Sequence, residues 1–152
     1  MLPCCSSDNR ARWGVAAGPL WNGHSVRVDD TALAAALVER LAPVVPSSIL
    51  LVAVGREIEA SAQERYGRVL MDVSDFGPLP GVDGYDEVTA LREACLHVLD
   101  TVQDFVAEMT AEPWPGRRVT PSPVVEVGDA AIALSYVTDG ETTLRLPDIA
   151  RS

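Results

Sequence analysis

Residues 86–111, which read DEVTALREACLHVLDTVQDFVAEMTA, carry the strongest structural signal in the chain. The stretch contains neither glycine nor proline, and its apolar residues follow one another at alternating steps of three and four. These apolar residues are Val88, Leu91, Cys95, Val98, Val102, Phe105 and Met109. The spacing predicts a single long amphipathic helix. Leu99 and Val106 widen its apolar stripe, so we expect the helix to face a hydrophobic core.

A shorter helix is predicted upstream of this stretch, over residues 31–42. Apolar residues recur there at helical spacing, and Asp29 or Asp30 can cap the first turn. Pro43 ends the run, because proline has no backbone N–H to donate to the helical ladder.

The segment between the two helices has the composition of strands. Residues 49–54 read ILLVAV, a continuous apolar run that contains β-branched residues. Such a run predicts a strand buried on both faces, or a strand that is buried on one face and lies at an edge. Residues 57–61 and 68–73 are predicted to form further strands. Residues 77–84 are rich in glycine and proline and are predicted to form a loop.

After residues 112–116, EPWPG, the apolar residues alternate with a period of two. They fall into three runs: Val125 and Val127, then Ile132, Leu134 and Tyr136, then Leu144 and Leu146. The pairs Gly128-Asp129 and Asp139-Gly140 separate these runs, and both are typical of turns. The pattern therefore predicts a three-stranded antiparallel meander.

The order of elements predicts an α+β fold, because the helices and the hairpins are segregated along the chain. We expect two layers: a mostly antiparallel sheet of five to six strands, with one short and one long helix packed on one face. Residues 26–152 form this single domain in the prediction, and residues 1–25 form an irregular N-terminal segment. The length of 152 residues is enough for one hydrophobic core.

The second half of the chain resembles a group of known sequences. Residues 98–108, VLDTVQDFVAE, are followed by EPWP and then by the predicted hairpins. This order resembles small uncharacterised acidic proteins of high-GC actinobacteria, over less than half of the chain. The resemblance implies no activity and no catalytic residues. The order of elements is also similar to that of small acidic secretion chaperones, which bind partner proteins.

The charge of the chain excludes several functions. The 22 acidic residues outnumber the 12 basic ones, which gives a formal net charge of -10. Such an excess of acid repels nucleic-acid phosphates and anionic membranes, so we expect neither as a partner. All basic residues are arginine, which excludes Schiff-base and P-loop lysines. With three cysteines and no secretion signal or apolar span in the sequence, we expect a cytoplasmic protein.

Few residues in the sequence carry catalytic chemistry. The two histidines, His24 and His97, belong to no metalloprotease or triad pattern, so a non-enzymatic role is favoured while an enzyme stays open. One row on the long helix has metal-ligand residue types: Glu93, His97, Asp100, Asp104 and Glu108, at steps of four, three, four and four. Such a row could bind a divalent cation only with ligands from a second helix. A solvated helix face is the simpler interpretation, so the sequence predicts no metal and no cofactor.

Three carboxylates of this row are among the candidate binding residues. We predict a non-enzymatic protein-binding module, of the immunity protein, chaperone or adaptor type, whose partner is a protein with a basic surface. The candidate partner-binding residues are Asp100, Asp104, Glu108, Trp114, Arg117 and Arg118. Two alternatives stay open: a small enzyme or ligand-binding protein with a cleft near Trp114, Arg117 and Arg118, and a virion or assembly component. The sequence also leaves a homodimer open.

Overall fold

The structure is a computed structural model that describes residues 29–63, 66–76, 86–116 and 118–151. The predicted irregular segment, residues 1–25, and the predicted loop, residues 77–84, lie outside these ranges.

The described residues have an α+β fold, as predicted. The elements, in chain order, are α2 (Asp30–Leu41), β1 (Ile49–Val54), β2 (Glu57–Ala62), β3 (Arg68–Asp72), the 3-10 helix η1 (Val73–Phe76), α3 (Glu87–Thr110), β4 (Ser122–Val127), β5 (Ala131–Thr138) and β6 (Glu141–Ala150). The six strands form two separate antiparallel sheets of three, with the orders β1-β2-β3 (sheet A) and β4-β5-β6 (sheet B). The prediction of one sheet with five to six strands is therefore wrong.

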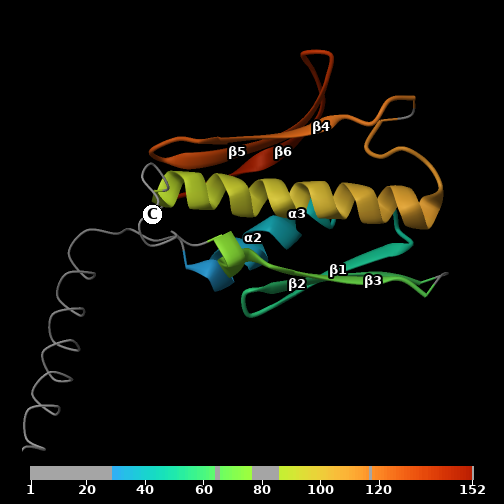
Figure 1. Cartoon of the computed structure of the whole chain (residues 1–152), viewed down its shortest axis with the longest axis horizontal. Helices are drawn as coiled ribbons and strands as arrows, with labels where there is room; N and C mark the ends of the chain where they lie inside the picture. The colour runs from blue at the N-terminus through green and yellow to red at the C-terminus, as the bar shows by residue number, and fades with distance from the viewer. Residues whose placement is uncertain (1–28, 64–65, 77–85, 117, 152) are drawn as a thin grey trace, which may run out of the picture.

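The two helices lie between the two sheets (Figure 1). Helix α3 packs against β2 and β3 of sheet A and against β4 of sheet B, while α2 packs against β1 and β2 of sheet A and β6 of sheet B. The molecule thus has three layers, and the prediction of helices on one face of a single sheet is also wrong. The physical reason is that α3 is buried beyond its apolar seam: Ala94 and Gln103 are inaccessible as well, so the helix has two sides to cover.

A side-chain cap at one end and a left-handed backbone residue at the other define α3. Its N-cap is Asp86, whose carboxylate accepts a hydrogen bond of 2.9 Å from the backbone N–H of Thr89. This bond satisfies one of the first-turn N–H groups that have no partner within the helix. At the other end, Ala111 adopts a left-handed conformation with φ of 57° and ends the helix before Pro113. In α2 the same capping role falls to Asp29, which accepts from the backbone N–H of Thr31 at 3.3 Å.

The predicted meander is confirmed as sheet B. Asp139 and Gly140 both have positive φ, at 50° and 81°, and they connect β5 to β6 in a tight turn. A two-residue turn with positive φ at both positions matches the twist of the strands it connects, and glycine adopts that conformation without steric cost. The turn at Gly128 is closed by its backbone N–H, which donates to the carbonyl of Ala131 at 2.9 Å.

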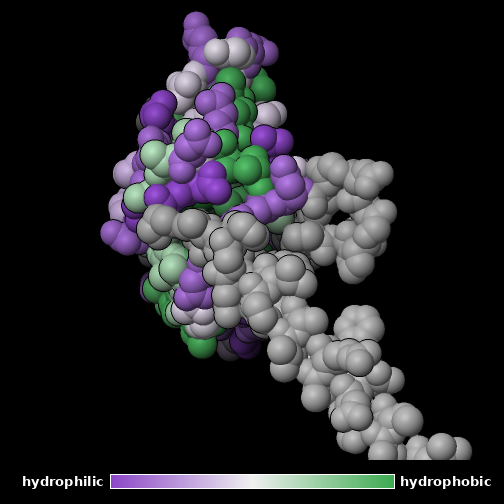
Figure 2. Space-filling model, turned by 90° about the vertical axis from the view of Figure 1, so that its left-hand side faces the viewer, coloured by the Kyte–Doolittle hydropathy of each residue, from purple (hydrophilic) through white to green (hydrophobic). Residues whose placement is uncertain are grey.

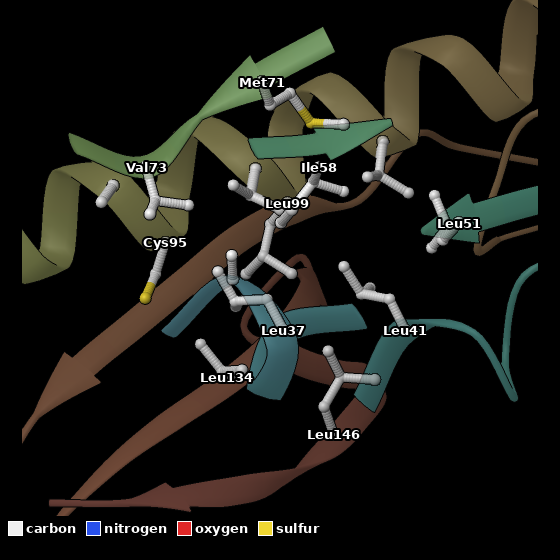
Figure 3. Close-up of a cluster of buried hydrophobic side chains, with 14 of the residues drawn as sticks. Leu37, Leu41, Leu51, Ile58, Met71, Val73, Cys95, Leu99, Leu134 and Leu146 are labelled. Carbon is white, nitrogen blue, oxygen red and sulfur yellow. The ribbon is translucent and has the colours of Figure 1, made fainter. Parts of the chain in front are cut away.

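One hydrophobic core joins all the layers. Figure 3 shows Leu37 and Leu41 of α2, Leu99 of α3, and strand side chains from both sheets converging on one cluster. Two buried hydrogen bonds tie α3 to the chain around sheet B. The Tyr136 hydroxyl donates to the carbonyl of Leu99 at 2.7 Å, and the Gln103 amide donates to the carbonyl of Pro121 at 2.6 Å. These bonds hold α3 at a fixed position and orientation against β4 and β5.

Candidate functional site

The predicted row on the long helix lies on the surface of α3. We define the acidic row as Glu93, His97, Asp100, Asp104 and Glu108, and all five side chains are exposed. The residues on the opposite side of the helix, including Val98, Val102 and Val106, are completely buried. The sheets lie on two sides of α3 (Figure 1), while the five side chains of the acidic row are exposed.

The carboxylates of the acidic row are not neutralised by arginines from the described part of the chain. The ion pairs between described residues lie elsewhere: Arg40 with Glu39, Arg56 with Asp72, Arg68 with Glu59, and Arg145 with Asp148. Because Asp100, Asp104 and Glu108 lie about one helical turn apart, with Glu93 on the same face, the negative charges of these four carboxylates add along the helix axis. The row therefore presents a negative potential on a helix that the core holds rigidly in place.

One carboxylate of the row, Asp100, affects the pKa of a buried tyrosine, Tyr136. Burial raises the pKa of the Tyr136 hydroxyl, and the negative charge of Asp100 raises it further. Tyr136 therefore stays protonated and keeps donating to Leu99, so this contact between α3 and sheet B does not depend on pH in the neutral range.

A single helix face gives the row a poor geometry for a metal ion. The five side chains are spread along about four turns of one helix, so they cannot all reach a single cation. The few that could reach it would need further ligands from a second element. Among residues 29–63, 66–76, 86–116 and 118–151, no group of three or more histidine, cysteine or acidic side chains is placed to hold a metal.

Two of the three predicted residues after the helix, Trp114 and Arg118, lie in the described part of the chain, and they have different environments. Trp114 is half-buried, and its ring packs edge to face against Tyr136, with centroids 5.3 Å apart and an interplanar angle of 71°. Its ring thus packs beside the core. Arg118 is exposed, while Arg117 lies outside the described residues. The structure therefore separates the roles of these two described residues, one in packing and one on the surface.

Cys95 is the described cysteine, and its environment makes it unreactive. Its side chain is inaccessible in the core, and burial raises the pKa of the thiol to about 12. Nucleophilic cysteines need a thiolate and access, and this position provides neither.

Sequence reasoning missed one surface feature, the outer face of sheet A. This face consists of Leu50, Val52, Val54, Glu57, Glu59, Ser61, Arg68, Leu70 and Asp72. Its apolar members are exposed, whereas the alternate residues of the same strands point into the core. The signal was present in the continuous apolar run of residues 49–54, but a run of this kind does not show which face remains uncovered.

Comparisons with protein-family models, with curated proteins and with solved structures found no match. Within the described residues, no helix has both the length and the apolar character needed to cross a membrane.

Proposed function

We propose that this protein is a non-enzymatic protein-binding module that recognises a basic protein surface through the acidic row of α3. The observation that carries the proposal is exposure without an arginine partner among the described residues: Asp100, Asp104 and Glu108 are exposed on one helix face, and no arginine of the described chain forms an ion pair with them. Carboxylates that are exposed and that no described arginine neutralises are available to a partner.

The rigidity of the helix supports the same role. A binding surface on a preorganised element loses little conformational freedom on association. Helix α3 is held between two sheets and is fixed by the Tyr136 and Gln103 hydrogen bonds. A helix that spans the domain, with its carboxylates in one line, suits a partner whose arginines or lysines lie along a ridge or a groove.

The net charge of -10 supports fast encounter with such a partner. Electrostatic attraction between complementary surfaces raises association rates, and this gain falls as salt screens the charges. An immunity protein, a chaperone or an adaptor would each use this property, because each must find its partner in competition with other proteins. We place this activity in the cytoplasm.

The test begins with capture of the partner from the native host, followed by binding kinetics at two ionic strengths. The test variant is the triple substitution Asp100→Asn, Asp104→Asn and Glu108→Gln. The matched control is Asp129→Asn, Asp139→Asn and Glu141→Gln, which removes the same charge from exposed positions in the turns of sheet B.

We expect the α3 variant to associate roughly tenfold more slowly at low salt, with a weaker salt dependence and a smaller change in the dissociation rate. The control variant should retain most of the wild-type association rate. Wild-type association by the α3 variant would contradict the proposal. Turnover of a small molecule by the purified protein without any partner would replace it with an enzymatic function.

A further inference from the structure

The outer face of sheet A exposes an apolar surface. Leu50, Val52 and Val54 of β1 are 49%, 40% and 68% exposed, and Leu70 of β3 is 53% exposed. They are four of the six large apolar side chains that are exposed among the described residues. The strand register places them on one face, because Val52 pairs with Glu59 and Glu59 pairs with Leu70. Figure 2 is turned about the vertical axis, so sheet A stays in the lower part of the molecule. Residues coloured as hydrophobic reach the surface there.

The composition of β1 does not match its position in a monomer. Strands that are apolar at every position are typical of burial on both faces, whereas a half-exposed strand alternates apolar and polar residues. In β1, Ile49 and Leu51 are buried at 6% exposure, and yet the residues between and after them are also apolar. A contiguous exposed apolar surface of this kind marks an interaction site. The outer side chains of β1 therefore suit burial against another protein surface, as the inner ones are buried against the core.

The charges on this face indicate which kind of molecule can cover it. Arg68 Nε lies 3.1 Å from Glu59 Oε1, and Arg56 Nε, at the rim of the face, lies 3.2 Å from Asp72 Oδ2. With Glu57, three carboxylates face two guanidinium groups, so the face carries one net negative charge in a chain whose net charge is -10. Two copies of the chain repel each other strongly through most of their surface, and much less through this face.

The face is also complementary to itself. It carries both signs of charge, and the Arg56 and Arg68 side chains, although each is paired within its own chain, are 62% and 63% exposed and so remain accessible to a facing molecule. A strongly basic partner, of the kind that the acidic row suits, would meet two arginines here and few uncompensated acids. A second copy meets a matching apolar stripe with ion pairs beside it.

We propose that a second copy of this chain covers the outer face of sheet A, forming a homodimer in which the two A sheets pack face to face about a twofold axis. The β1 stripe of each copy then lies in the interface, at the usual separation of about 10 Å between packed sheets. Because α3 packs on the inner face of sheet A, the acidic row stays outside the interface, and the dimer carries two such rows.

The size of the face sets the strength of the dimer. Three strands about 4.8 Å apart, each with about six residues at about 3.3 Å per residue, cover an area of roughly 14 by 20 Å. Stable complexes bury about 800 Å² on each partner, roughly three times the area of this face, so the dimer is expected to be weak and reversible. Its salt dependence should be opposite to that of the acidic row, since salt screens the repulsion between two copies.

The experiment is sedimentation equilibrium of the full chain over the micromolar concentration range, at low and at high salt. The test variant is Leu50→Thr, Val52→Thr and Val54→Thr, in which threonine keeps a good strand propensity while it makes the stripe polar. Val54→Thr alone, at the most exposed of the three positions, is a second variant that leaves the rest of the strand unchanged. Val119→Thr, which changes an exposed apolar side chain outside this face, is the matched control.

We expect the wild type to dimerise with concentration and more tightly at high salt. The triple variant should raise the Kd about tenfold or more, the single variant by less, and the control should leave it unchanged. Circular dichroism and thermal melts should show that each variant is folded. A wild type that stays monomeric at every concentration would overturn the proposal. Dimerisation of the triple variant at the wild-type Kd would overturn it as well.

Discussion

At the scale of single residues, Tyr136 contributes the contact that sequence patterns are least able to predict. Alternation along residues 131–138 places its ring on the inner face of sheet B, and the ring is completely inaccessible. The hydroxyl, however, finds its acceptor 37 residues earlier, at the carbonyl of Leu99. No local pattern encodes a pairing between positions so far apart. Gln103 is a similar case. This polar residue beside the seam is buried, and its side-chain amide is satisfied by donating to the carbonyl of Pro121, 18 residues later.

The Tyr136→Phe variant tests the value of this hydroxyl. The substitution keeps the ring and its contact with Trp114, and it removes one buried hydrogen bond, so we expect the free energy of unfolding to fall by about 1 kcal/mol. Urea unfolding followed by circular dichroism measures the change. Tyr66→Phe is the control, because that side chain is fully exposed and its hydroxyl should contribute nothing measurable. Equal stability of the wild type and the Tyr136→Phe variant would show that the bond adds no net stability.

At the scale of elements, the sequence predicts most of what the structure contains. The predicted helices over residues 31–42 and 86–111 correspond to α2 and α3 within a residue or two at each end. The run at residues 49–54 coincides with β1, and the three alternating runs after residue 116 correspond to β4, β5 and β6. These elements are predictable because periodicity, caps and turn residues act over a few positions.

The apolar seam of α3 makes this helix the centre of stability. Phe105 is 7% exposed in the middle of the core cluster, so Phe105→Ala removes a large buried ring and leaves a cavity. We expect a loss of about 3–5 kcal/mol in the free energy of unfolding, measured by denaturant titration. Asp104→Ala, at the neighbouring exposed position, should not destabilise the fold, because it removes no buried group. A loss below about 1 kcal/mol for Phe105→Ala would contradict the burial of the seam.

The cap of α3 makes its stability depend on pH at the acidic end of the scale. The hydrogen bond from Thr89 lowers the pKa of the Asp86 carboxyl below its usual value of 3.8. A group whose pKa is lower in the folded state stabilises the fold above its unfolded pKa, and that contribution is lost as the pH falls through the folded pKa. We therefore expect the wild type to lose more of its thermal stability than Asp86→Asn between about pH 5 and about pH 2, since asparagine caps a helix without titrating. Melting temperatures across this range test the prediction, and parallel pH profiles for the two proteins would refute it.

At the scale of the whole molecule, the sequence is a poorer guide. The pairings within each sheet connect strands that are neighbours in the chain, and these were predictable. Whether sheets A and B join at their edges into one sheet depends on contacts between residues far apart in the chain. The number of apolar residues does not decide it. The inaccessible Ala94 and Gln103 of α3, beside a seam that was already wide, show the helix to be covered from two sides. The candidate site was limited in the same way: the exposure of the acidic row follows from helical geometry, whereas the packing of Trp114 against Tyr136 required the fold.

The acidic row also has a cost to the molecule that carries it. Asp100, Asp104 and Glu108 are like charges at successive i,i+4 positions, which destabilise a helix by about 0.2–0.5 kcal/mol per pair. They also lie in the half of α3 nearer its C-terminus, where the helix dipole disfavours negative charge, and they belong to a chain with a net charge of -10. The triple variant Asp100→Asn, Asp104→Asn and Glu108→Gln should therefore be more stable than the wild type, by roughly 0.5–1 kcal/mol at low salt. The gain should shrink at high salt, where the repulsion is already screened.

Thermal melts of the wild type and of this variant at two ionic strengths measure the difference. The control variant at Asp129, Asp139 and Glu141 removes the same charge without any i,i+4 pair on a helix, so it should gain less. A lower melting temperature for the α3 variant at low salt would mean that the carboxylates stabilise the helix through local contacts. A gain in stability together with a loss in association rate would instead show that the row is retained for binding, at the expense of the fold.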